Sequence, residues 1–214
     1  MVVHCVSNRA KAEETRKLIE EKGGKAAVVT GDLTDPCTAE RLMAENGPLD
    51  ALVLDASMQI RRPWQKISLE EYQKQMTCNF YSSLRLIQLA VPHMKAQKWG
   101  RIVTIGSVQE RKPHPDMLVY LASKAAQTNM AQPLAQQLAA DGITVNNVAP
   151  GVIFTDRNVE ALSDPTYAAE VTASIPAGFY GEPRDCAGVV RLLLSEAARY
   201  ITGQSIYVDG GKSL

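Results

Sequence analysis

The chain has 214 residues, of which 45% are hydrophobic and 21% are charged. This composition is typical of a globular domain with a sizeable core and excludes the disordered and fibrous classes of protein. The 23 Lys and Arg residues balance the 23 Asp and Glu residues, so no overall charge favours nucleic acid or an anionic membrane as a partner. We expect one cytoplasmic domain over residues 1–214, because no apolar run is long enough for a signal peptide or a membrane span.

Short β-branched runs alternate along the chain with longer helical stretches. In the first part, the predicted elements are a strand over 2–6, a helix over about 9–22, a strand over 25–30, a helix capped by Asp35 or Thr38 that ends near Asn46, and a strand over 51–54. The later elements are a helical region over about 68–98, a strand over 101–105, a helix over about 120–140, a strand over 144–148, a helix over 185–198 and a strand over 205–208. This alternation predicts an α/β fold with a Rossmann-like, doubly wound parallel sheet flanked by helices.

The segment Pro150–Arg184 has no clear periodic pattern, although short helices around 159–163 and 165–174 fit within it. Segments of this length inside a compact domain are typical of lids and binding loops. We therefore expect a substrate lid over residues 154–184.

Three polar residues lie where a doubly wound fold binds its ligands, at the carboxyl ends of strands. Ser107 follows the strand 101–105, and Tyr120 and Lys124 open the next helix. Residues four apart share one helix face, and an ammonium beside a phenol lowers the pKa of the phenol. Tyr120 is thus a candidate acid/base for a carbonyl or hydroxyl oxygen, with Ser107 hydrogen-bonded to the same oxygen. The alternative is an ordinary helix in which Tyr120 packs and Lys124 is solvated.

The segments around this pair form a larger pattern. The matching segments, in chain order, are Cys78-Asn79-Phe80, Gly106-Ser107, Tyr120-x-x-x-Lys124, Asn146 to Thr155, Gly181-Glu182-Pro183 and Ile201 to Gly211. In this order and at these spacings the sequence resembles the short-chain dehydrogenase/reductase family. The match extends from roughly Val2 to Gly211.

The resemblance implies an oxidoreductase that interconverts a carbonyl and a secondary alcohol by hydride transfer with NAD(P)(H). It implies a catalytic tetrad of Asn79, Ser107, Tyr120 and Lys124. Tyr120 would be the general acid/base, and Lys124 would bridge to the nicotinamide ribose. Asn79 would hold a helix kink and a proton-relaying water, although a buried side chain that bonds neighbouring backbone is an equal alternative for this residue.

The resemblance also implies cofactor-binding positions besides Tyr120 and Lys124. The turn at Pro150 and Gly151 would present Ile153 and Thr155 to the nicotinamide carboxamide. The pair Asp32-Leu33 is similar to the adenine-contacting pair of the family.

The residues after the first predicted strand bear on the choice of cofactor. No acidic residue ends this strand to bind a ribose 2′-hydroxyl, whereas Ser7, Asn8 and Arg9 can contact a 2′-phosphate. We therefore expect NADP rather than NAD. The alternative for Asn8 is a helix cap.

Two segments depart from the family pattern. The strand, Gly-rich turn and helix with which the family opens are not found, since the first glycines are Gly23, Gly24 and Gly31. In the order 3-2-1-4-5-6 the central strand would be missing, and its two neighbours would stay unpaired unless the sheet closes or another chain supplies the pairing. Leu54-Asp55-Ala56-Ser57 also replaces the family's Asn-Asn-Ala-Gly, which is consistent with a weakened or lost dinucleotide site.

Two alternatives of other classes therefore stay open. One is a cofactor-free protein that acts as a binding or assembly partner. The other is a non-redox enzyme that uses Ser107, Tyr120 and Lys124 for enolisation, elimination or hydrolysis.

The expected partners are a small carbonyl or alcohol substrate and further copies of this chain. The helices over 68–98 and 120–140 carry more apolar residues than one face needs, which predicts a homodimer or homotetramer, unless these residues are ordinary core. The four cysteines lack metal-ligand spacing, so we expect free thiols and no metal site.

Overall fold

Two parallel sheets form the centre of the molecule. The computed structural model describes residues 1–214, apart from the side chain of Ala161. The strands in these residues are β1 (Val2–Cys5), β2 (Ala27–Thr30), β3 (Ala51–Leu54), β4 (Gly100–Ile105), β5 (Ile143–Pro150) and β6 (Ser205–Val208). β1 pairs with β2, and the larger sheet has the order β3-β4-β5-β6, with parallel pairing throughout. The predicted α/β fold with a parallel sheet is confirmed.

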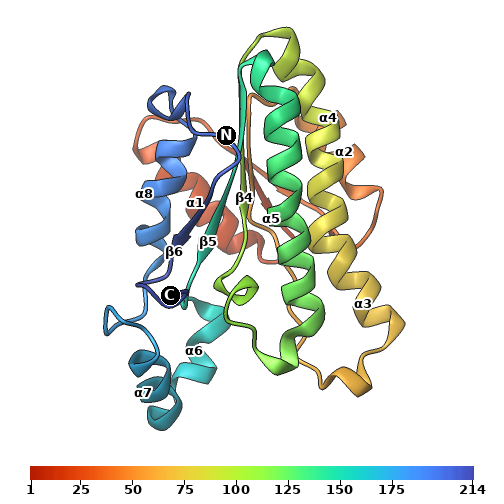
Figure 1. Cartoon of the computed structure of the whole chain (residues 1–214). Coiled ribbons are helices and arrows are strands. Elements are labelled where there is room, and N and C mark those ends of the chain that lie inside the picture. Colours follow the sequence, from red (N-terminus) through yellow and green to blue (C-terminus); the bar gives the residue numbers. More distant parts are fainter.

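Helices cover the sheet on both faces (Figure 1). They are α1 (Arg9–Glu21), α2 (Thr38–Asn46), α3 (Leu69–Met76), α4 (Ser82–Ala96), α5 (Leu118–Leu138), α6 (Asp156–Leu162), α7 (Pro165–Ala173) and α8 (Pro183–Leu193). The expected lid segment thus contains α6 and α7, close to the two short helices predicted there. Among the helices described, none combines the length and the apolar character that crossing a membrane requires.

Alternate residues of β4 enter two different cores. Ile102 lies in a cluster with residues of α4 and α5, whereas Val103 lies in a cluster with Leu193 of α8, and both β4 side chains are fully buried. A parallel strand with helices on both faces is apolar on both. This burial fixes the end of β4, and with it the start of the loop that carries Ser107.

The helical region predicted over 68–98 is interrupted in its middle. One π-helical turn, Thr77–Tyr81, separates α3 from α4. Such turns insert a residue into an α-helix and often lie at functional sites. Here the turn contains Asn79, which is fully buried.

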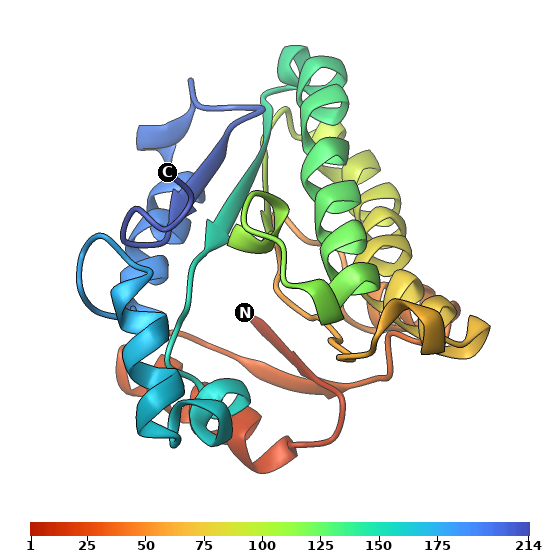
Figure 2. The ribbon, with the colours of Figure 1, turned by 60° about the horizontal axis from the view of Figure 1, so that its bottom comes forward.

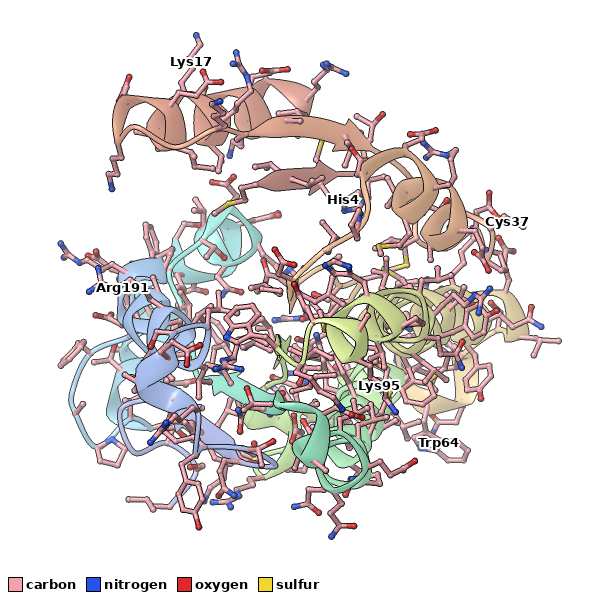
Figure 3. The ribbon with its side chains drawn as sticks, turned by 90° about the horizontal axis from the view of Figure 1, so that it is seen from above. His4, Lys17, Cys37, Trp64, Lys95 and Arg191 are labelled. Carbon is pink, nitrogen blue, oxygen red and sulfur yellow. The ribbon has the colours of Figure 1, made fainter. Side chains whose placement is uncertain are left out.

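The sheet is interrupted between β1 and β3, as expected from the missing central strand, and it does not close over the gap. Within the described residues, β1 pairs only with β2 and β3 pairs only with β4. Figures 2 and 3 show α1, β1 and β2 to one side of the larger sheet. Each of the two strands therefore keeps one unpaired edge, and Val53 of β3 is 44% exposed.

Candidate active site

A cavity of about 560 Å³ lies at the carboxyl ends of β3, β4 and β5. This is the edge of a parallel sheet where ligands bind. Residues from each strand end and from α5 and α6 line it, including Asp55, Ser57, Ser107, Tyr120, Lys124, Pro150, Gly151, Ile153, Thr155 and Arg157. The structure thus brings together three residues of the expected tetrad and the expected nicotinamide-contacting residues.

Ser107 is held at the end of β4 by a short helical turn, Val108–Glu110. The Ser107 hydroxyl accepts a hydrogen bond from the Gln109 amide at 3.2 Å, and the Ser107 amide donates to Oε1 of Glu110 at 3.0 Å. The same Oε1 accepts a hydrogen bond from the Thr128 hydroxyl of α5 at 2.8 Å. Glu110 therefore ties the loop of Ser107 to the helix that carries Tyr120 and Lys124. The Ser-x-x-Glu spacing of a capping box is the signal that could have identified it.

Burial raises the pKa of the Glu110 carboxyl above its ordinary value of 4.5. The folded state therefore binds this proton more tightly than the unfolded state. The stability that results is present below pH 4.5 and is lost as the pH rises through the raised folded pKa.

Glu110→Gln keeps the acceptor oxygen and removes the buried charge, so we expect a higher free energy of unfolding than the wild type at pH 7 and no such difference in acid. Glu110→Ala leaves the Ser107 amide and the Thr128 hydroxyl without this acceptor and should cost about 1–3 kcal/mol. Urea denaturation at pH 7 and pH 4 measures both effects. Equal destabilisation by Gln and Ala at pH 7 would contradict the role of this oxygen.

Tyr120 and Lys124 lie one turn apart on α5, as predicted, with exposed fractions of 7% and 1%. Burial raises the pKa of Tyr120, and Arg157 and Ser107 oppose this shift only in part. The Lys124 ammonium lies 6.0 Å from the centre of the Tyr120 ring. The expected lowering of the Tyr120 pKa by Lys124 is therefore wrong for this structure, since desolvation outweighs the opposing effects of Arg157 and Ser107 and the phenol stays protonated at neutral pH.

Burial also lowers the pKa of Lys124, to about 8, although Asp55 opposes the shift. The Lys124 ammonium donates hydrogen bonds to the Ile105 carbonyl at 2.6 Å and to Oε1 of Gln127 at 3.2 Å. The solvated lysine of the alternative interpretation is thus excluded.

Asn79, the fourth residue of the expected tetrad, does not line the cavity. Its Oδ1 accepts a hydrogen bond from the Met58 amide at 2.7 Å, and its Nδ2 donates to the Met58 carbonyl at 2.9 Å and to the Ser123 hydroxyl at 2.8 Å. These are the contacts of a buried side chain that bonds neighbouring backbone. They also join the π-helical turn to the residue before Lys124, and a part in proton relay stays a prediction.

The structure does not bring Ser7, Asn8 and Arg9 to the cavity wall. Asn8 accepts a hydrogen bond from the Lys11 amide at 3.2 Å and caps α1, as its alternative interpretation has it. Arg9 forms an ion pair with Glu13 at 3.4 Å.

Asp32 and Leu33 also lie outside the cavity wall. Oδ1 of Asp32 accepts a hydrogen bond from the Thr34 amide at 2.9 Å, and this bond lowers the pKa of Asp32. Leu33 is 4% exposed and packs with Leu42 and Cys78.

Arg157 lines the cavity and was not predicted from the sequence. Nη2 of Arg157, at the start of α6, donates hydrogen bonds to the Ser57 carbonyl at 3.0 Å and to the Ser57 hydroxyl at 3.2 Å. Arg157 thus connects the expected lid to the segment that follows β3. No motif marks it, because the two residues are far apart in the sequence.

Known proteins are similar to this chain over all or most of its length. A family model described as enoyl-(acyl carrier protein) reductase matches residues 1–213. The chain is 36% identical over 203 residues to a glucose 1-dehydrogenase of Gluconobacter oxydans, which covers 92% of this chain and 76% of that protein. It is 34% identical over 219 residues to 3beta-hydroxysteroid dehydrogenase 1 of Eggerthella lenta, which covers 100% and 84%.

A solved structure is similar as well. The crystal structure of a 3-oxoacyl-(acyl-carrier-protein) reductase from Agrobacterium tumefaciens C58, with NADP bound, matches with a TM-score of 0.91 and 33% identity over 98% of this chain and 83% of that one. The chain belongs to the short-chain dehydrogenase/reductase family of NAD(P)-dependent oxidoreductases.

Proposed function

We propose that the protein interconverts a carbonyl and a secondary alcohol with NADP, and that Tyr120 is the general acid/base. The observation that supports this best is the cavity wall itself. It carries Ser107, Tyr120 and Lys124 at the carboxyl edge of the sheet.

The residues of the wall suit reduction of a carbonyl. Because burial raises its pKa, Tyr120 holds a proton at neutral pH that it can donate to the carbonyl oxygen. The Ser107 hydroxyl hydrogen-bonds the same oxygen as negative charge develops on it. Lys124, with a pKa of about 8, is mostly protonated at neutral pH and lies one turn from Tyr120.

The donor set of the wall fits the nicotinamide half of a dinucleotide. The Lys124 ammonium and the Thr155 hydroxyl can hydrogen-bond ribose and carboxamide groups, as can the backbone from Pro150 to Ile153. When bound, the dinucleotide supplies or accepts the hydride. For the adenosine half we propose Ser7, Asn8, Arg9, Asp32 and Leu33, which the structure leaves outside the cavity wall.

Binding of NADPH tests the proposal. We expect a saturable increase of NADPH fluorescence on titration with the protein. We also expect that Arg9→Ala weakens binding of NADPH more than binding of NADH, because a 2′-phosphate contact is lost. Lys17→Ala, on the same helix, is the matched control. The absence of saturable binding would contradict the proposal and favour the cofactor-free protein or the non-redox enzyme.

We propose a small, negatively charged carbonyl or alcohol as the substrate. Arg61, His114 and Arg157 all line the cavity and can pair with a carboxylate. Four side chains of α6 and α7 also line it, namely Asn158, Leu162, Tyr167 and Val171, which supports the lid expected over 154–184.

We propose that the protein forms a homodimer or homotetramer. In its favour, Leu69, Tyr72 and Leu118 are 69%, 46% and 47% exposed on α3 and α5. Against it, Ile87 and Ala90 of α4 serve the core, as the alternative interpretation has it. The cytoplasmic location expected from the sequence also stays a prediction.

A further inference from the structure

A buried chain of hydrogen bonds runs from Lys124 away from the cavity. The Lys124 ammonium donates to Oε1 of Gln127, and Nε2 of Gln127 donates to the Ser83 hydroxyl at 2.8 Å. The Ser83 hydroxyl donates to the Asn79 carbonyl at 3.2 Å. None of the four side chains is more than 3% exposed. These hydrogen bonds therefore join α5 to α4 and to the π-helical turn without a contact to solvent.

The direction of these bonds fixes how the Gln127 amide is turned. A serine hydroxyl has one proton to donate, and Ser83 donates it to the Asn79 carbonyl. Ser83 can then only accept from Gln127, so the amide nitrogen faces Ser83 and the amide oxygen faces Lys124. An ammonium has three protons and no acceptor, and the amide oxygen satisfies one of them.

We propose that Gln127 is a positioning residue for Lys124. Its amide oxygen holds the buried ammonium at the cavity wall, and Ser83 holds the amide. This inference rests on the proposed function for its effect on catalysis, but its structural content is independent of any cofactor.

Gln127 and burial have opposite effects on the pKa of Lys124. A hydrogen bond that the charged form donates favours that form, so Gln127 raises the pKa of Lys124 while desolvation lowers it to about 8. The charged and titratable groups that face Lys124 from other elements also contribute to this pKa. Asp55, Cys78 and Glu110 raise it and Arg157 lowers it, and Tyr120 lies on the same helix. None of these groups changes when Gln127 is replaced.

Two replacements of similar size should move the pKa of Lys124 in opposite directions. Gln127→Met removes the acceptor, so we expect the pKa to fall by about one unit, in line with the loss of one hydrogen bond to a charged group. Gln127→Glu places a carboxylate against the ammonium, so we expect the pKa to rise by about one unit or more. The Ser83 hydroxyl can turn and donate to the carboxylate, which keeps this variant folded.

The pKa is measured on the protein alone by NMR titration of lysines labelled with ¹³C at Cε. Exposed lysines titrate near 10.4, so the Lys124 resonance stands apart, and its absence from Lys124→Ala assigns it. Gln75→Met is the matched control. Gln75 is equally buried and donates to the Glu71 carbonyl, and we expect its loss to leave the Lys124 titration unchanged.

Opposite shifts in the two Gln127 variants support the inference. An unchanged midpoint, or shifts in the same direction, would overturn it, and Gln127→Glu decides alone if Gln127→Met does not fold. In active enzyme the alkaline limb of the kcat/KM profile should move with the NMR midpoint. If no variant reduces a carbonyl, the proposed function fails while the NMR result still decides the role of Gln127.

Discussion

Tyr120→Phe should lower kcat for NADPH-dependent carbonyl reduction by about 10²–10⁴-fold, the loss expected when a general acid is removed. The change deletes one hydroxyl from the cavity wall and leaves the ring, which is 7% exposed, in its packing. The backbone carbonyl of Tyr120, which accepts a hydrogen bond from the Ser123 hydroxyl at 2.7 Å, is untouched. We therefore expect the midpoint of urea unfolding to stay close to that of the wild type.

Tyr200→Phe is the matched control, because Tyr200 lies outside the cavity and is 99% exposed. The kcat of this control should equal that of the wild type within about twofold, as expected for a surface hydroxyl that does not line the cavity. A Tyr120→Phe variant that keeps more than a tenth of the wild-type rate would remove Tyr120 from its proposed role. The non-redox alternative predicts a different result, namely turnover without NADPH that the same variant abolishes.

Most of the strands and helices could be predicted from local sequence patterns. The predicted strands over 51–54 and 205–208 have their observed bounds. β4 begins one residue earlier than predicted, and β5 begins one residue earlier and ends two residues later. These strands are short apolar runs between turn residues, so periodicity and length suffice to identify them. The π-helical turn was not predicted as such, because it inserts a residue without changing the apolar spacing on either side.

The site was predictable where spacing along one element decides it. Residues 120 and 124 share a helix face by their spacing alone, and the structure places both at the cavity. The direction of the Lys124 side chain was not predictable. Four flexible methylene groups let the ammonium reach the Ile105 carbonyl and Gln127 rather than the phenol. The contact with Ile105 depends on how α5 packs against β4, and no sequence motif marks Gln127.

The interrupted sheet should make the first 30 residues far less protected from hydrogen exchange than the rest. The residues of β1 are all only half-buried, and in α1 only Ala12 is buried. A two-stranded sheet is marginally stable by itself. In β4, by contrast, every residue except Ile105 is buried, so its amides should exchange only through large-scale unfolding.

We expect amides of β1 and β2 to exchange at least about 10³-fold faster than those of β4 and β5, a difference of about 4 kcal/mol in opening free energy within the range between local and global opening. Hydrogen exchange with mass spectrometry, on peptides from residues 1–30, 100–150 and 200–214, measures it. Equal protection would show that the unpaired edges of β1 and β3 are covered in solution. β6 is the internal control, since it also has four residues, is mostly half-buried and lies at a sheet edge. β6 belongs to a four-stranded sheet, whereas β1 pairs with a single strand. A difference in exchange rate between β1 and β6 therefore isolates the effect of the interruption.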